Sequence, residues 1–163
     1  MNVCSQAEMS TGRAIEVCSV RAGATLYGVP ITRIFEILGA TAVQPVPLAP
    51  AYIGGVAHYR GEVLTVVSLR SLLALPPHDR PSDILVFEGH DGYFGVLVDA
   101  VGEVLTILPE SFEPNPSTLD DRRNVLFAGA CKLQTGLLIM LDPDRFDPMR
   151  LSGDSSEHQT DHE

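Results

Sequence analysis

Residues 27–38 read Tyr-Gly-Val-Pro-Ile-Thr-Arg-Ile-Phe-Glu-Ile-Leu, and residues 94–105 read Phe-Gly-Val-Leu-Val-Asp-Ala-Val-Gly-Glu-Val-Leu. Eight of the twelve positions agree in residue type, at a constant offset of 67. An internal repeat of this kind marks one structural unit that occurs more than once, and it fixes the architecture before any single motif does. The chain is therefore expected to contain two copies of the same unit.

A second block of the chain also occurs twice. Gly55-Val56 with Tyr59, Val63-Leu64 and Val67 corresponds to Gly129-Ala130 with Leu133, Leu137-Leu138 and Leu141, at an offset of 74. The change of offset from 67 to 74 means that the second copy carries seven extra residues between its blocks. Prolines and acidic residues between Pro109 and Asn124 predict that these extra residues form an exposed loop.

Each copy is divided into short apolar segments, which is typical of strands rather than helices. The predicted strands are 15–20, 25–29, 34–38, 56–59 and 63–67 in the first copy, and 84–88, 93–98, 101–107, 128–133 and 137–141 in the second. Five short strands can curl into a small barrel, which removes the exposed edges of an open sheet. The expected fold class is all-β, with two five-stranded barrels side by side.

The repeat also predicts how the chain is divided. Residues 1–12 are expected to form a flexible N-terminus, and residues 13–151 a single domain. Within that domain we expect a first lobe at about 13–75, closed by a short helix at 68–74, a proline-rich linker at 76–82 and a second lobe at about 83–151. The acidic tail, 152–163, has no apolar face and is expected to be disordered.

Composition narrows the class of partner. A chain of 163 residues with 45% hydrophobic content buries enough surface for one compact domain without metal or disulfide staples. The net charge of −10 disfavours nucleic acid, because non-specific affinity for a phosphate backbone comes mainly from Lys and Arg. The same sign disfavours attachment to anionic lipid. Protein partners are therefore expected.

Cysteines and apolar runs bear on the cellular location. Cys4, Cys18 and Cys131 lie far apart and are odd in number, which fits a reducing cytoplasm. The N-terminal segment lacks a continuous apolar core, so it does not predict a signal peptide. Residues 37–59 carry no charged side chain, but their prolines and glycines exclude a membrane helix. We expect a cytoplasmic protein with no direct membrane insertion.

Motifs in a fixed order resemble the CheW family of chemotaxis adaptors. They are Tyr27-Gly28-Val29-Pro30-Ile31, Ile34-Phe35-Glu36-Ile37-Leu38, Pro45-Val46-Pro47, Tyr52-Ile53-Gly54-Gly55-Val56 and Tyr59-Arg60-Gly61-Glu62-Val63. In the second half, 94–99 and 101–105 are similar to the second-lobe signature of that family. The resemblance covers about residues 15–146 and implies two SH3-like five-stranded lobes.

The resemblance also implies a function. Proteins of this kind are non-catalytic adaptors that bind the regulatory domain of a CheA-type histidine kinase and the cytoplasmic tip of a chemoreceptor. We expect no cofactor, and a monomer outside the chemosensory array. Two features depart from the family pattern: His58-Tyr59 stands where the family has Asn-Leu before the Arg-Gly turn, and Ser68 stands where it has Asp after the fifth strand.

The surface expected to contact kinase or receptor combines charged, turn and apolar residues. Its predicted members are Glu36, Gly55, Tyr59, Arg60, Gly61, Ile31, Ile34, Leu97, Val98 and Val101. Arg60 is placed at the tip of a hairpin whose turn needs the positive φ of Gly61. Glu36 has two alternatives, to face water or to pair with Arg60. The apolar members either line a receptor-binding groove, as the family implies, or belong to the core.

Other classes of protein lack support in the sequence. No G-x-S-x-G, P-loop or G-x-G-x-x-G pattern is present, so an enzyme is not expected. Asp142, Asp144 and Asp147 mimic part of a calcium loop but lack its glycine and closing glutamate. His158 and His162 have no further ligand in a fixed frame, so no metal is expected. The alternative function is a ligand-sensing or regulatory β-barrel without a kinase partner, which would need an open apolar interior.

Overall fold

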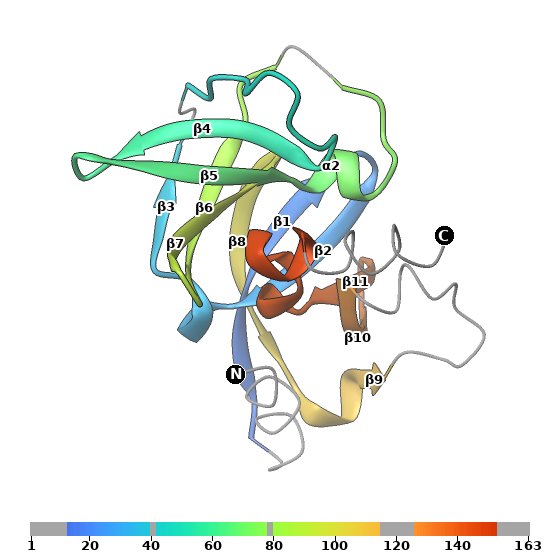
Figure 1. Cartoon of the computed structure of the whole chain (residues 1–163). Coiled ribbons are helices and arrows are strands. Elements are labelled where there is room, and N and C mark those ends of the chain that lie inside the picture. The colour runs from blue at the N-terminus through green and yellow to red at the C-terminus, as the bar shows by residue number, and fades with distance from the viewer. Residues whose placement is uncertain (1–12, 40–41, 78–79, 115–125, 153–163) are drawn as a thin grey trace, which may run out of the picture.

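The computed structural model describes residues 13–39, 42–77, 80–114 and 126–152, shown in colour in Figure 1. The predicted flexible N-terminus and all but the first residue of the predicted disordered tail lie outside the described residues. The elements in chain order are β1 (Ile15–Ala22), β2 (Thr25–Pro30), the 3-10 helix η1 (Ile31–Arg33), β3 (Glu36–Leu38), β4 (Ile53–Tyr59), β5 (Glu62–Ser68), α2 (Leu69–Leu72), β6 (Asp83–Gly89), β7 (Gly92–Val98), β8 (Ala100–Ile107), η2 (Pro109–Ser111), β9 (Phe112–Pro114), β10 (Phe127–Leu133), β11 (Gly136–Leu141) and η3 (Pro143–Phe146).

The strands form two sheets, which confirms the all-β class. One sheet has six strands in the order β8-β1-β2-β11-β10-β9, and the other has five in the order β3-β6-β7-β5-β4. Neighbouring strands are antiparallel except for the pairs β2–β11 and β5–β7, which are parallel. Parallel neighbours cannot be joined by a tight turn, so these two pairs bring together segments from different parts of the chain.

The sheets do not follow the two halves of the sequence. The β1–β2 hairpin of the first copy pairs with β8 and β11 of the second copy. The β6–β7 hairpin of the second copy pairs in the same way with β3 and β5 of the first. Figure 1 shows the result, with blue β1 beside yellow β8, β6 beside β3, and β7 beside β5. Each sheet therefore joins the first hairpin of one copy to the later strands of the other.

This exchange corrects the predicted division into lobes 13–75 and 83–151. The hairpin predicted at Arg60-Gly61 is present, because a turn fixes the pairing of two neighbouring strands. For strands that are distant in the sequence, the pattern of apolar residues shows which side chains are buried but not which strand pairs with which. The strand-by-strand repeat is real, but the two copies exchange their first hairpins and form one interlocked domain.

A sixth strand corrects the strand count of the second copy. β9 lies within the stretch that was predicted to be an exposed loop, and it pairs with β10 at Gly129. The first copy has a reduced version of the same contact, an isolated bridge between Gln44 and Val56. β9 has only three residues, Phe112-Glu113-Pro114, and its proline and glutamate are not typical of a strand, so the sequence pattern did not predict it.

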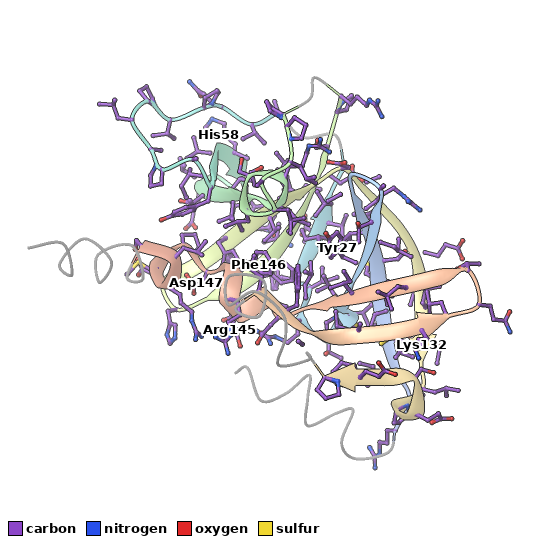
Figure 2. The ribbon with its side chains drawn as sticks, turned by 90° about the vertical axis from the view of Figure 1, so that its right-hand side faces the viewer. Tyr27, His58, Lys132, Arg145, Phe146 and Asp147 are labelled. Carbon is purple, nitrogen blue, oxygen red and sulfur yellow. The ribbon has the colours of Figure 1, made fainter. Side chains whose placement is uncertain are left out.

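The buried apolar side chains form three clusters. One fills the six-stranded sheet around Val17 and Leu138, and another fills the five-stranded sheet around Val66 and Ile84. The third contains buried residues of both sheets, such as Tyr27 of β2 and Phe94 of β7, together with Phe146 of η3; Figure 2 labels Tyr27 and Phe146. We call this third cluster the junction core. It is the largest of the three, so the sheets share much of their hydrophobic stabilisation.

Candidate functional site

The turn between β4 and β5 has a conformation that its sequence only partly predicts. Tyr59 pairs with Glu62, so Arg60 and Gly61 form a two-residue loop. Both loop residues have a positive φ, 51° at Arg60 and 79° at Gly61, as a type I′ turn requires. Glycine adopts this conformation at little cost, but arginine does so rarely. The hairpin thus holds Arg60 in a strained backbone position.

An ion pair joins this turn to β3. Arg60 donates a hydrogen bond from Nη2 to Oε1 of Glu36 over 2.8 Å. The hydroxyl of Tyr59 donates to the same carboxylate oxygen over 3.0 Å. Of the two alternatives for Glu36, the structure shows the pairing with Arg60. The side chains remain accessible, with exposed fractions of 64% for Arg60 and 36% for Glu36.

Aromatic rings surround the Arg60 guanidinium. Its central carbon lies 5.3 Å from the ring centroid of Phe35 and 5.3 Å from that of Tyr59. The rings of Phe35 and Tyr93 are 4.5 Å apart, and Tyr93 meets Tyr59 edge-on at 6.1 Å. We call these five residues, Phe35, Glu36, Tyr59, Arg60 and Tyr93, the Arg60 cluster.

Sequence reasoning found three members of the Arg60 cluster and missed Phe35 and Tyr93. Phe35 directly precedes Glu36, but nothing in the sequence shows which way it turns. Tyr93 reaches the site because β7 lies beside β5, in a parallel pair that no local pattern predicts. One feature of the sequence could have indicated an aromatic cluster here: Tyr59 stands at a position where the family pattern has leucine.

Electrostatics keep both polar donors of the cluster protonated. Burial raises the pKa of Tyr59, and its hydrogen bond to Glu36 raises it further. The hydrogen bond to Glu36 also raises the pKa of Arg60, with the neighbouring Tyr59 contributing. Glu36 therefore receives two hydrogen bonds at neutral pH, one of them from a cation.

The predicted apolar residues do not join the Arg60 cluster in one patch. Ile31, Ile34 and Val101 are partly buried against the junction core. Leu97 is partly buried against the core of the five-stranded sheet. Val98 is 1% exposed, so it is a core residue and offers no surface to a partner.

Gly55 has a structural role in β4. Its φ of 143° favours glycine, and a Cβ there would lie 2.3 Å from the carbonyl oxygen of Gln44. The register of the β4–β5 pair shifts at this point, which marks a β-bulge. Gly55 is buried as well, so we remove it from the predicted contact surface.

The three aspartates that mimic a calcium loop have other tasks. The side chain of Asp142 accepts hydrogen bonds from the Asp144 amide and from Arg145, and Asp144 forms an ion pair with Arg33. Asp147 accepts from the amides of His90 and Met149. Burial raises the pKa of Asp142; burial acts in the same direction on Asp144, but Arg33 holds the pKa of that carboxyl below its ordinary value. Across the described ranges, no group of three or more His, Cys, Asp or Glu side chains is placed to hold a metal ion.

A partly buried ion pair joins α2 to the residue between β7 and β8. Arg70 in α2 donates from Nη1 to Asp99 over 2.7 Å, and the same carboxylate accepts the Gly23 amide over 2.8 Å. The helix itself is capped by Ser68, whose hydroxyl accepts the Ser71 amide. Serine is a strong N-cap residue, so the departure at Ser68 keeps the cap that an aspartate would supply.

Two of the cysteines are buried in the structure. Burial raises the pKa of the Cys131 thiol from 9.0 to about 11, and it raises that of Cys18 as well, so both are protonated at neutral pH. No helix in the part of the chain that the structure describes has the length and apolar character needed to cross a membrane.

Fold and site together define a class of protein: an all-β domain of two interlocked sheets with an exposed, ring-lined ion pair at the end of one sheet. The CheW-like domain model matches residues 16–147, most of the chain. This chain therefore belongs to the CheW-like domain family, which confirms the resemblance seen in its motifs.

Relatives and a solved structure agree with this assignment. The chain is 30% identical over 129 residues to the probable chemotaxis protein CheW of Rhizobium etli, covering 78% of this chain and 83% of that protein. It is 29% identical over 135 residues to the chemotaxis protein CheW of Rhizobium meliloti, covering 82% and 87%. The crystal structure of the scaffolding protein TtCheW from Thermoanaerobacter tengcongensis superposes with a TM-score of 0.73 at 24% identity, over 85% of this chain and 96% of that one.

Proposed function

We propose that this chain is a non-catalytic adaptor of the cytoplasm that couples chemoreceptors to a CheA-type histidine kinase. Its membership of the CheW-like domain family supports this role, and its relatives carry the names chemotaxis protein and scaffolding protein. The single observation that carries the proposal is the Arg60 cluster, an exposed and oriented ion pair on a hairpin of this fold. We expect the free protein to be a monomer outside the array.

The exposure of the ion pair favours recognition over stability. An ion pair between exposed side chains contributes about 0–1 kcal/mol to folding, because water and salt screen it. At an interface the same charges steer a partner and suppress wrong ones. The positive φ of Arg60 destabilises the fold, and so weak an ion pair does not offset this free energy. This supports a function of Arg60 in binding.

The buried interior argues against the alternative function of ligand sensing. A sensor barrel needs an open cavity, but side chains such as Leu138 and Met140 fill one sheet, and Leu64 and Val66 fill the other. The net charge of −10 remains unfavourable for nucleic acid and anionic lipid. A protein partner is the remaining class.

The test is kinase coupling by Arg60→Ala and Glu36→Ala variants. Alanine carries a Cβ as arginine does, so the cost of positive φ at residue 60 stays nearly the same and the charge is what changes. Each variant should unfold within about 1 kcal/mol of the original protein. Each should fail to support kinase autophosphorylation in a reconstituted assembly of receptor, adaptor and kinase.

A matched control lies on the other sheet. Lys132 on β10 pairs with Glu113 on β9 over 3.4 Å; Lys132 is more exposed than Arg60, and Glu113 is more exposed than Glu36. Figure 2 shows Lys132 far from His58, which lies on the same strand as Tyr59. Lys132→Ala should leave kinase coupling intact. Full coupling by both cluster variants would refute the proposed site, and early unfolding of both would show a structural role instead.

A further inference from the structure

The rings around Arg60 come from three separate parts of the chain. Phe35 precedes β3, Tyr59 ends β4 and Tyr93 lies near the start of β7. Only 6% of the residues are aromatic, and three of them meet here: the ring of Tyr59 belongs to the core of the five-stranded sheet, and the rings of Phe35 and Tyr93 lie against it at the surface. Phe35 is 43% exposed and Tyr93 is 39% exposed. Exposed rings that touch one another are unusual unless something binds to them.

Three constraints act on the guanidinium at once. It lies within cation–π distance of two rings, and it donates to Glu36. Its backbone is fixed by the two-residue turn. Tyr59 contributes twice, because its ring faces Arg60 while its hydroxyl holds the carboxylate that Arg60 binds. An arginine that is already ordered loses less rotamer freedom when a partner binds.

We propose that Phe35, Tyr59 and Tyr93 are positioning residues that hold the Arg60 guanidinium in one orientation before a partner binds. This inference rests on the proposed function, because it concerns the same surface. The remaining N–H donors of Arg60 and the exposed rings of Phe35 and Tyr93 fit a partner segment with a carboxylate next to an apolar side chain. Arginine recognises carboxylates through its planar fork of donors, and rings with arginine are typical of interface hot spots.

The first measurement concerns the adaptor alone. The side-chain Nε–H signal of Arg60 in a ¹⁵N NMR spectrum is assigned by its loss in Arg60→Ala. In the original protein it should be displaced by the nearby rings and slow to exchange with water. Phe35→Leu should remove part of the displacement, and Tyr59→Phe should speed the exchange, because the carboxylate loses its second donor.

The matched control is Tyr52→Phe. It deletes the same oxygen atom from a tyrosine that precedes β4, at the opposite end of that strand from Tyr59. This variant should leave the Arg60 signal unchanged. An Arg60 signal that is the same in the original protein, Tyr59→Phe and Phe35→Leu would overturn the proposal, as would an equal change in Tyr52→Phe.

The second measurement is the affinity for the regulatory domain of the CheA-type kinase from the same organism. Tyr59→Phe should weaken binding by about three- to tenfold, the effect of one ordinary hydrogen bond, with a melting temperature like that of the original protein. Unchanged affinity in the presence of an altered Arg60 signal would overturn the link to recognition. If the original protein does not bind the kinase domain, the proposed function fails and with it the recognition part, while the NMR signal still decides whether the rings position Arg60.

Discussion

Arg60 and Leu48 are non-glycine residues with a positive φ, and the two side chains differ in what surrounds them. Arg60 is held in its conformation by Glu36 and two rings. Leu48 also has a positive φ, of 64°, and its side chain is fully exposed at 104%. The Ala49 amide donates to the Val46 carbonyl over 3.3 Å, so Leu48 occupies the turn position that favours glycine or asparagine.

Leu48 gives a prediction for stability. Leu48→Asn should stabilise the fold by about 0.5–1 kcal/mol, because asparagine tolerates the left-handed region and the exposed leucine makes no packing contact that would be lost. Denaturant unfolding measures the change. Val46→Asn, in the same turn but without positive φ, should bring no gain. A loss of stability in Leu48→Asn would show that the leucine packs against the domain after all.

At the scale of the element, one glycine in each copy sets the shape of a strand. Gly55 in β4 and Gly129 in β10 stand at equivalent places in the repeat, and the register shifts beside each of them. A Cβ would lie 2.3 Å from the Gln44 oxygen at Gly55 and 2.4 Å from the Glu113 oxygen at Gly129. The glycines of the second repeated block are therefore places where a third segment crosses closely over a hairpin.

The bulge glycines can be tested against a glycine of the turn. Gly55→Ala should cost roughly 2–3 kcal/mol, because the new Cβ meets backbone that cannot move aside without breaking the bridge to Val56. Gly61→Ala should cost about 1 kcal/mol, since its φ is positive but nothing lies within 4 Å of the added carbon. Chemical denaturation measures both. If both variants lose the same stability, the positive φ alone accounts for the cost of Gly55→Ala, and crowding by the Gln44 backbone adds nothing.

At the scale of the molecule, the exchanged hairpins make the two copies depend on each other. The junction core draws Val20 and Tyr27 from the first copy and Phe94 and Phe127 from the second. A fragment of about 70 residues is close to the lower limit for a stable core without staples. Here such a fragment also loses the partners of its first hairpin, since β1 pairs with β8 and β2 with β11.

We therefore expect neither half of the chain to fold alone. Residues 13–80 and residues 81–152, made as separate peptides, should each give narrow amide NMR signals and no cooperative unfolding. Mixed in equal amounts, they should recover a dispersed spectrum, because the exchanged strands need no covalent link at residues 78–82. A cooperative transition in either peptide by itself would contradict the interlocked arrangement.

The sequence by itself determined the all-β class, the duplication, the Arg60-Gly61 hairpin and the family. These features depend on local rules: turns fix neighbouring strands, and periodicity shows which faces are buried. It also placed Glu36, Tyr59 and Arg60 on a common surface through the family motifs. Only the tertiary structure decided that the copies exchange hairpins, that Val98 and Gly55 are buried, and that Phe35 and Tyr93 complete the Arg60 cluster. Those facts depend on which distant strands pair. The pairing is set by the burial of all three clusters at once, and no single segment of the sequence contains that information.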